Sequence, residues 1–220
     1  MEAFYRSNLP RKMQSGTKTG HRFRSKRLRH VSVVPALRVA LVRDGRLFDY
    51  LTTNAGSLRR NQPSALHYLA RRCMQWQELE TPESDTLACR ELGCASAQAL
   101  ERVATGLDKD DAAVLGILTD VAYSYLAGVL PISDLERVLS LTEDLGFELF
   151  HPELYSMTAE LGRKSRMGRH SSSVFLLRGI GHGTETQPCD PALLEHAVRL
   201  LESWGGKGQV SWPELAGVEG

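Results

Sequence analysis

Hydrophobic positions recur at helical spacing along most of the chain. The longest apolar run, Val114 to Leu130, is apolar nearly all round, which is typical of a central helix that is buried on every side. The next apolar run, Leu135 to Leu141, forms a single stripe. Pro131 separates the two runs, we expect Ser133 to cap the second helix, and Gly146 ends it. The pattern therefore predicts a hairpin of two helices joined at a proline.

The same spacing predicts further helices on both sides of this hairpin. The pair Asp44-Gly45 is a turn signal inside an apolar pattern, so that pattern indicates two helical pieces. The pair Asp190-Pro191 supplies an N-cap and a first helical residue for the last helix. The acidic turn Asp108 to Asp111 suits the start of the long central helix, because carboxylates stabilise a helix N-terminus. The other expected helices are 34–51 in two pieces, 63–80 and 96–104.

One segment has the character of a strand. Ser173 to Ile180 contains a short apolar run, and glycines follow it closely. The segments Thr81–Leu87 and Arg163–Arg169 lack apolar periodicity, so we expect loops there. Together these patterns predict a mainly α protein, a helical bundle with at most one or two short strands.

Basic residues are concentrated at the N-terminus. Residues 1–30 contain nine Lys or Arg and one acid, Glu2, although the whole chain has a net charge of only +1. This segment has little apolar periodicity, so we expect disorder over 1–30, a helical domain over 31–205 and a flexible tail over 206–220. Within the basic run only Phe23 is available for stacking on bases, and we therefore expect a solvated tail and no specific binding of nucleic acid.

The composition is that of an ordinary globular protein, with 42% hydrophobic and 24% charged residues over 220 positions. The most apolar run is shorter than a bilayer requires and includes Asp120, and no secretory signal is readable at the N-terminus. The four cysteines lack the CxxC spacing of a zinc ribbon, so we expect reduced thiols. These features predict a cytoplasmic protein that does not enter a membrane.

Four segments resemble one known family. They are Ala112–Leu154, with two helices and a His-Pro turn, RVALVRDGRLFDYL at 38–51, FLLRGIGHGTE at 175–185 and DPALLEHAVRLLES at 190–203. In these segments the chain is similar to the helical C-terminal domain of the 3-dehydroquinate synthase-like family, the sugar phosphate cyclases. The resemblance implies the same helical bundle in this chain.

The resemblance also implies a chemistry. Members of the family are lyases that use NAD and a divalent metal, zinc or cobalt, to eliminate phosphate and close a ring. Their metal ligands are a glutamate and two histidines, and those positions fall on Pro35, Cys94 and Lys109 here. Pro35 and Lys109 cannot serve as ligands, so Cys94 is the one surviving candidate for metal binding. Gln98 stands where the family has a proton-transferring histidine.

Arg38 falls on a family lysine, and the resemblance implies that Arg38 and Lys109 hold a phosphate between them as substrate-binding residues. Ordinary surface charge is the alternative for both residues. The motif GIGHG at 179–183 lacks a full GxGxxG, so we expect no dinucleotide there. No residue is identified as catalytic, and we expect no cofactor to be bound by this chain alone.

Three hypotheses about function stay open. In the first, the chain is a sugar phosphate cyclase-like fragment with a degenerate metal site, inactive by itself. In the second, a nucleotide-binding half from another chain, or a corrected sequence, completes an active NAD- and metal-dependent cyclase. In the third, the bundle is a noncatalytic interaction domain with a basic N-terminal arm. A domain that is normally covered by another half should expose an apolar face, so self-association is also expected.

Overall fold

The structure is a computed structural model that describes residues 33–78, 91–166 and 173–206. The expected disorder over 1–30 and the expected loop over 81–87 lie outside these residues, as does nearly all of the expected tail. The helices are α1 (Val33–Val42), α2 (Gly45–Arg59), α3 (Pro63–Glu78), α5 (Cys94–Val103), α6 (Lys109–Leu126), α7 (Ile132–Leu145), α8 (Glu153–Arg166) and α9 (Pro191–Gly205), and the strands are β1 (Ser173–Gly179) and β2 (His182–Pro188).

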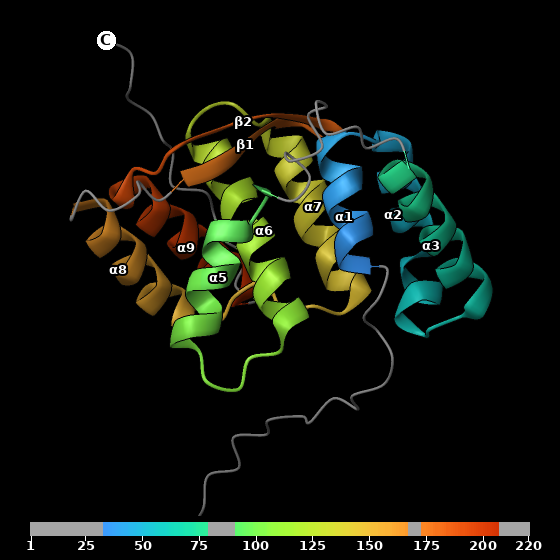
Figure 1. The fold of residues 1–220 in the computed structure, drawn as a ribbon, viewed down its shortest axis with the longest axis horizontal. Coiled ribbons are helices and arrows are strands. Elements are labelled where there is room, and N and C mark those ends of the chain that lie inside the picture. The colour runs from blue at the N-terminus through green and yellow to red at the C-terminus, as the bar shows by residue number, and fades with distance from the viewer. Residues whose placement is uncertain (1–32, 79–90, 167–172, 207–220) are drawn as a thin grey trace, which may run out of the picture.

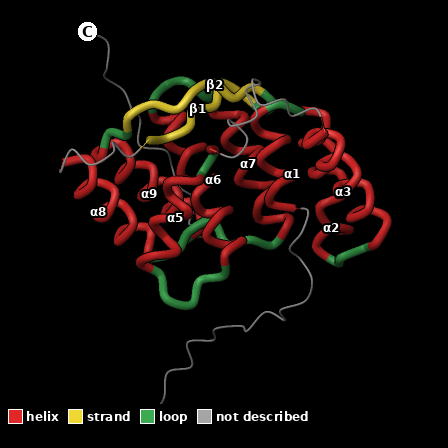
Figure 2. The backbone as a smooth tube through the Cα atoms, viewed as in Figure 1, coloured by secondary structure: helices red, strands yellow, loops and turns green. Residues whose placement is uncertain are grey.

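The described residues form a helical bundle built around α6, which confirms the predicted fold class. Helices α5 and α9 pack on one side of α6, and α7 and α1 pack on the other (Figure 1). The antiparallel strands β1 and β2 lie across one end of the helices, where Figure 2 shows them in yellow. None of the described helices combines the length and the apolar character needed to cross a membrane.

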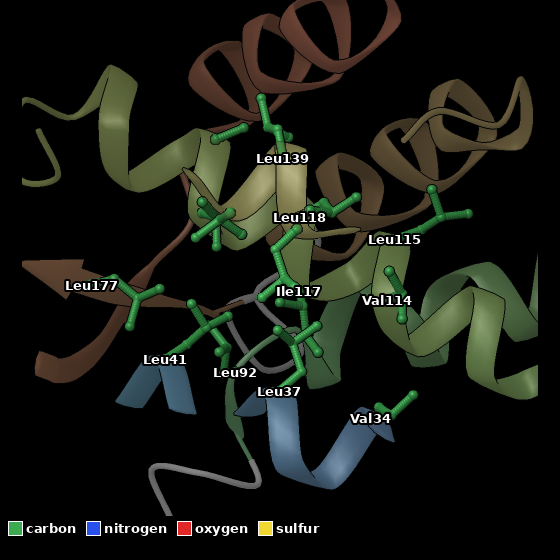
Figure 3. Close-up of a cluster of buried hydrophobic side chains, with 14 of the residues drawn as sticks. Val34, Leu37, Leu41, Leu92, Val114, Leu115, Ile117, Leu118, Leu139 and Leu177 are labelled. Atoms are coloured by element: carbon green, nitrogen blue, oxygen red, sulfur yellow. The ribbon is translucent and has the colours of Figure 1, made fainter. Parts of the chain in front are cut away.

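The core is assembled on α6, where nearly every residue from Ala112 to Ser124 is buried. Figure 3 shows Leu37 and Leu41 of α1 directed toward Ile117, with Leu177 of β1 close to Leu41. Each of these four side chains is at most 1% exposed. Full burial of a leucine or isoleucine side chain contributes about 1.5–3 kcal/mol, so this contact fixes α1 and β1 on the central helix.

Polar side chains of α6 accept hydrogen bonds from backbone N–H groups of β1, as a neighbouring strand would. The Phe175 N–H donates to Asp120 Oδ2 at 3.2 Å, and the Leu177 N–H donates to Ser124 Oγ at 3.0 Å. The four residues from Asp120 to Ser124 advance roughly 6 Å along the helix. Two residues of a strand advance roughly 6.8 Å. The two acceptors on α6 therefore match the spacing of two outward N–H groups on β1.

The glycine-rich segment after β1 is a tight turn. Gly181 adopts a φ of 82°, and a Cβ at this position would lie 2.7 Å from the Gly45 backbone nitrogen. The Gly181 N–H donates to the Leu41 carbonyl at 2.8 Å. The GIGHG motif thus joins β1 to β2 and fastens the hairpin to the end of α1.

Two glycines let α5 and α6 approach closely. A Cβ on Gly116 would lie closer than 3.0 Å to the Gly93 carbonyl oxygen and to the Ala97 nitrogen. Both are backbone atoms, which cannot swing aside as a flexible side chain can. Gly93 precedes α5 with a φ of 71°, a conformation that favours glycine.

Several predicted helix boundaries are confirmed. Asp44 caps α2 by accepting from the Leu47 N–H at 3.1 Å. Asp190 caps α9 by accepting from the Ala192 N–H at 2.9 Å. Gly146 ends α7 with a φ of 92°.

Other predictions were wrong. The N-cap of α7 is Pro131, with no side-chain cap hydrogen bond, so Ser133 does not cap this helix. The loop expected over 163–169 begins too early, because α8 continues to Arg166. The strand β2 was not predicted as a separate element, since its sequence HGTETQP has no apolar alternation.

The close approach of α5 and α6 makes Gly116 a sensitive position. Gly116→Ala should lower the free energy of unfolding by about 2 kcal/mol or more, because the added methyl group overpacks a rigid contact. Gly56→Ala is the matched control: Gly56 lies inside α2, and its Cβ would meet only the flexible Arg60 side chain, at 3.5 Å. The free energy of unfolding of this control should rise by up to about 1 kcal/mol, because alanine has a higher helix propensity than glycine. Urea unfolding of both variants checks the prediction, and equal effects would contradict it.

Candidate functional site

Three of the residues named from the sequence lie in the first turn of a helix, and Arg38 lies in the middle of α1. Pro35 is exposed in the first turn of α1, and Arg38 is partly buried one turn later. Cys94 is the first residue of α5, where its side chain is partly buried. Lys109 is the first residue of α6 and is exposed.

The structure places Arg38 within electrostatic reach of Cys94 and of Asp120 on α6. Burial lowers the pKa of Arg38, while electrostatic interactions with Cys94 and Asp120 act in the opposite direction. The Arg38 Nε is fully buried and has no hydrogen-bond partner among the described residues. A buried donor without an acceptor costs about 1–3 kcal/mol, so the guanidinium is well suited to receive an anion.

Asp120 is the residue that sequence analysis missed as part of a site. Its side chain is 2% exposed and accepts from the Gly93 N–H at 2.7 Å and from the Phe175 N–H at 3.2 Å. Burial raises the pKa of this carboxyl to about 7, although both N–H groups and the Arg38 charge oppose the rise. The sequence did contain a signal for Asp120, because it is an acid inside an otherwise apolar run. A buried ionisable group of this kind needs partners.

Gln98 completes the group of residues around Cys94. It lies one turn further along α5, and its Nε2 donates to Cys94 Sγ at 3.1 Å. We call Arg38, Cys94, Gln98 and Asp120 the Arg38 cluster. It combines a cation, a thiol, an amide donor and a carboxyl of raised pKa, contributed by α1, α5 and α6.

The structure does not bring Lys109 into this cluster. Helices α5 and α6 are consecutive and pack side by side, with the start of α5 against Gly116 in the middle of α6. Lys109 lies at the opposite end of this pair, and the eleven residues from Lys109 to Asp120 span roughly 16 Å of helix. A single phosphate therefore does not bridge Arg38 and Lys109 in this arrangement.

The residues that the resemblance places at the metal-ligand positions do not fit a divalent ion. Pro35 has no donor atom on its side chain, and Lys109 is a cation distant from Cys94. The Arg38 charge interacts electrostatically with the Cys94 thiol and would repel a metal ion there. Within the described ranges, no group of three or more His, Cys, Asp and Glu residues could hold a metal ion.

A separate surface hollow lies away from this cluster. It has a volume of about 660 Å³ and is lined by residues of α2, by Arg60, and by Asp144 of α7. Arg59 and Arg60 give it positive charge, but it contains no residue of the Arg38 cluster. The electrostatic interactions and the buried polar atoms point to the cluster as the candidate site, because the hollow is open and its charged groups are solvated.

Comparison with solved structures gives clear matches. The chain is similar to ValA, a 2-epi-5-epi-valiolone synthase from Streptomyces hygroscopicus subsp. jinggangensis 5008 with NAD+ and Zn2+ bound, with a TM-score of 0.66 and 25% identity over 78% of this chain and 50% of that chain. It is also similar to 2-deoxy-scyllo-inosose synthase complexed with carbaglucose-6-phosphate, NAD+ and Co2+, with a TM-score of 0.60 and 15% identity over 76% of this chain and 50% of that chain.

Both of these proteins are sugar phosphate cyclases of the dehydroquinate synthase family, so the resemblance inferred from the sequence is confirmed. No family model matches the chain, and no curated protein matches it. The chain spans about half the length of each of the two solved structures.

The buried Asp120 should make stability depend on pH. Its ordinary pKa is 3.8 and its pKa in the folded protein is about 7. Between these values the unfolded chain has released this proton and the folded chain still holds it, so this group's contribution to stability falls as pH rises from about 4 to about 7. Asp120→Asn cannot lose the proton. The stability of this variant relative to wild type should therefore rise across that window and level off above it.

Urea unfolding at half-unit pH steps from 4 to 8 measures this difference. Asp144→Asn, at an exposed position on α7, corrects for the general effect of removing one negative charge. A corrected difference that stays constant across the window would contradict the raised pKa of Asp120.

Proposed function

We propose that this chain is the helical half of a sugar phosphate cyclase-like protein, and that Arg38 binds the phosphate of a phosphorylated sugar. The structural match to two sugar phosphate cyclases supports the first part. One of these cyclases is complexed with carbaglucose-6-phosphate, which supports a phosphorylated sugar as the ligand class.

The binding proposal rests on the buried Nε and the positive charge of Arg38. Among the described residues its Nε is buried without a partner, and the carboxyl that acts on it electrostatically, Asp120, is not fully ionised at neutral pH. Since the pKa of Asp120 is about 7, that carboxyl carries only part of a negative charge there. Arg38 therefore retains uncompensated positive charge, and a guanidinium can bind two phosphate oxygens at once.

We also propose that these 220 residues do not catalyse cyclisation by themselves. The residues at the metal-ligand positions do not fit a divalent ion, so no chemical step is assigned to a metal here. The similar cyclases have NAD+ bound, and this chain matches half of their length. Catalysis would need a nucleotide-binding part that the described residues do not provide.

The competing proposal is an active cyclase completed by a separate nucleotide-binding half. The similarity to two NAD+-bound enzymes favours it. Mixing the chain with such a half, NAD+ and zinc or cobalt distinguishes the two proposals. Release of inorganic phosphate from a sugar phosphate, dependent on this chain, would support an active pair and would contradict a site that only binds.

Arg38→Gln should weaken the binding of glucose 6-phosphate by about tenfold or more, because a charge-assisted hydrogen bond contributes roughly 1.5–3 kcal/mol. Arg38→Lys should retain part of the affinity through its charge. Arg46→Gln, an exposed position on α2, is the matched control and should leave binding unchanged. Titration calorimetry at pH 7 measures the affinities, with glucose as the ligand that lacks a phosphate. Equal affinity for glucose and glucose 6-phosphate, or no effect of Arg38→Gln, would contradict the proposal.

A further inference from the structure

We draw no further inference here: the strongest candidate, the open surface hollow between the last turns of α2 and Asp144 of α7, is lined by solvated charges of both signs, and nothing in the part of the chain that the structure describes shows what would occupy it.

Discussion

The carboxyl of Asp120 connects three parts of the fold that are distant in sequence. It is carried by the central helix α6, and it accepts hydrogen bonds from the N–H groups of Gly93 and Phe175. One bond fixes the start of α5, and the other fixes β1. Because this carboxyl is 2% exposed, neither bond can be replaced by one to bulk water, and the arrangement of α5 and the hairpin depends on this side chain.

The same carboxyl determines how much charge the candidate site carries. Burial disfavours its ionised form, while two N–H donors and the Arg38 cation favour that form, and the balance leaves its pKa near 7. Arg38 is held on the inner side of α1 because Leu37 and Leu41 of that helix are fully buried against the core. Packing thus fixes the position of the Arg38 guanidinium, and the protonation state of Asp120 determines how much of the Arg38 charge is compensated.

Hydrophobic periodicity was sufficient to predict the helices, since α6 and α7 bury the residues that the pattern assigned to their inner faces. It was not sufficient for β2 or for the end of α8, because both sequences are polar and lack apolar periodicity. The family resemblance identified Arg38 and Cys94. Asp120 was not identified as their partner, because the sequence shows an acid in an apolar helix but not which N–H groups meet it.

A charge argument explains how one fold supports a different site chemistry. The similar valiolone synthase has Zn2+ bound, whereas Cys94, the one candidate ligand that the resemblance leaves in this chain, interacts electrostatically with the Arg38 guanidinium. A divalent ion at Cys94 would lie close to the Arg38 charge in a partly buried setting, where repulsion between like charges is weakly screened. An arginine can provide a positive charge for an anionic ligand, but it cannot provide the open coordination position of a catalytic metal. The proposed function therefore assigns to the Arg38 cluster the binding of an anion without metal-assisted catalysis, on a fold that is similar to that of the two cyclases.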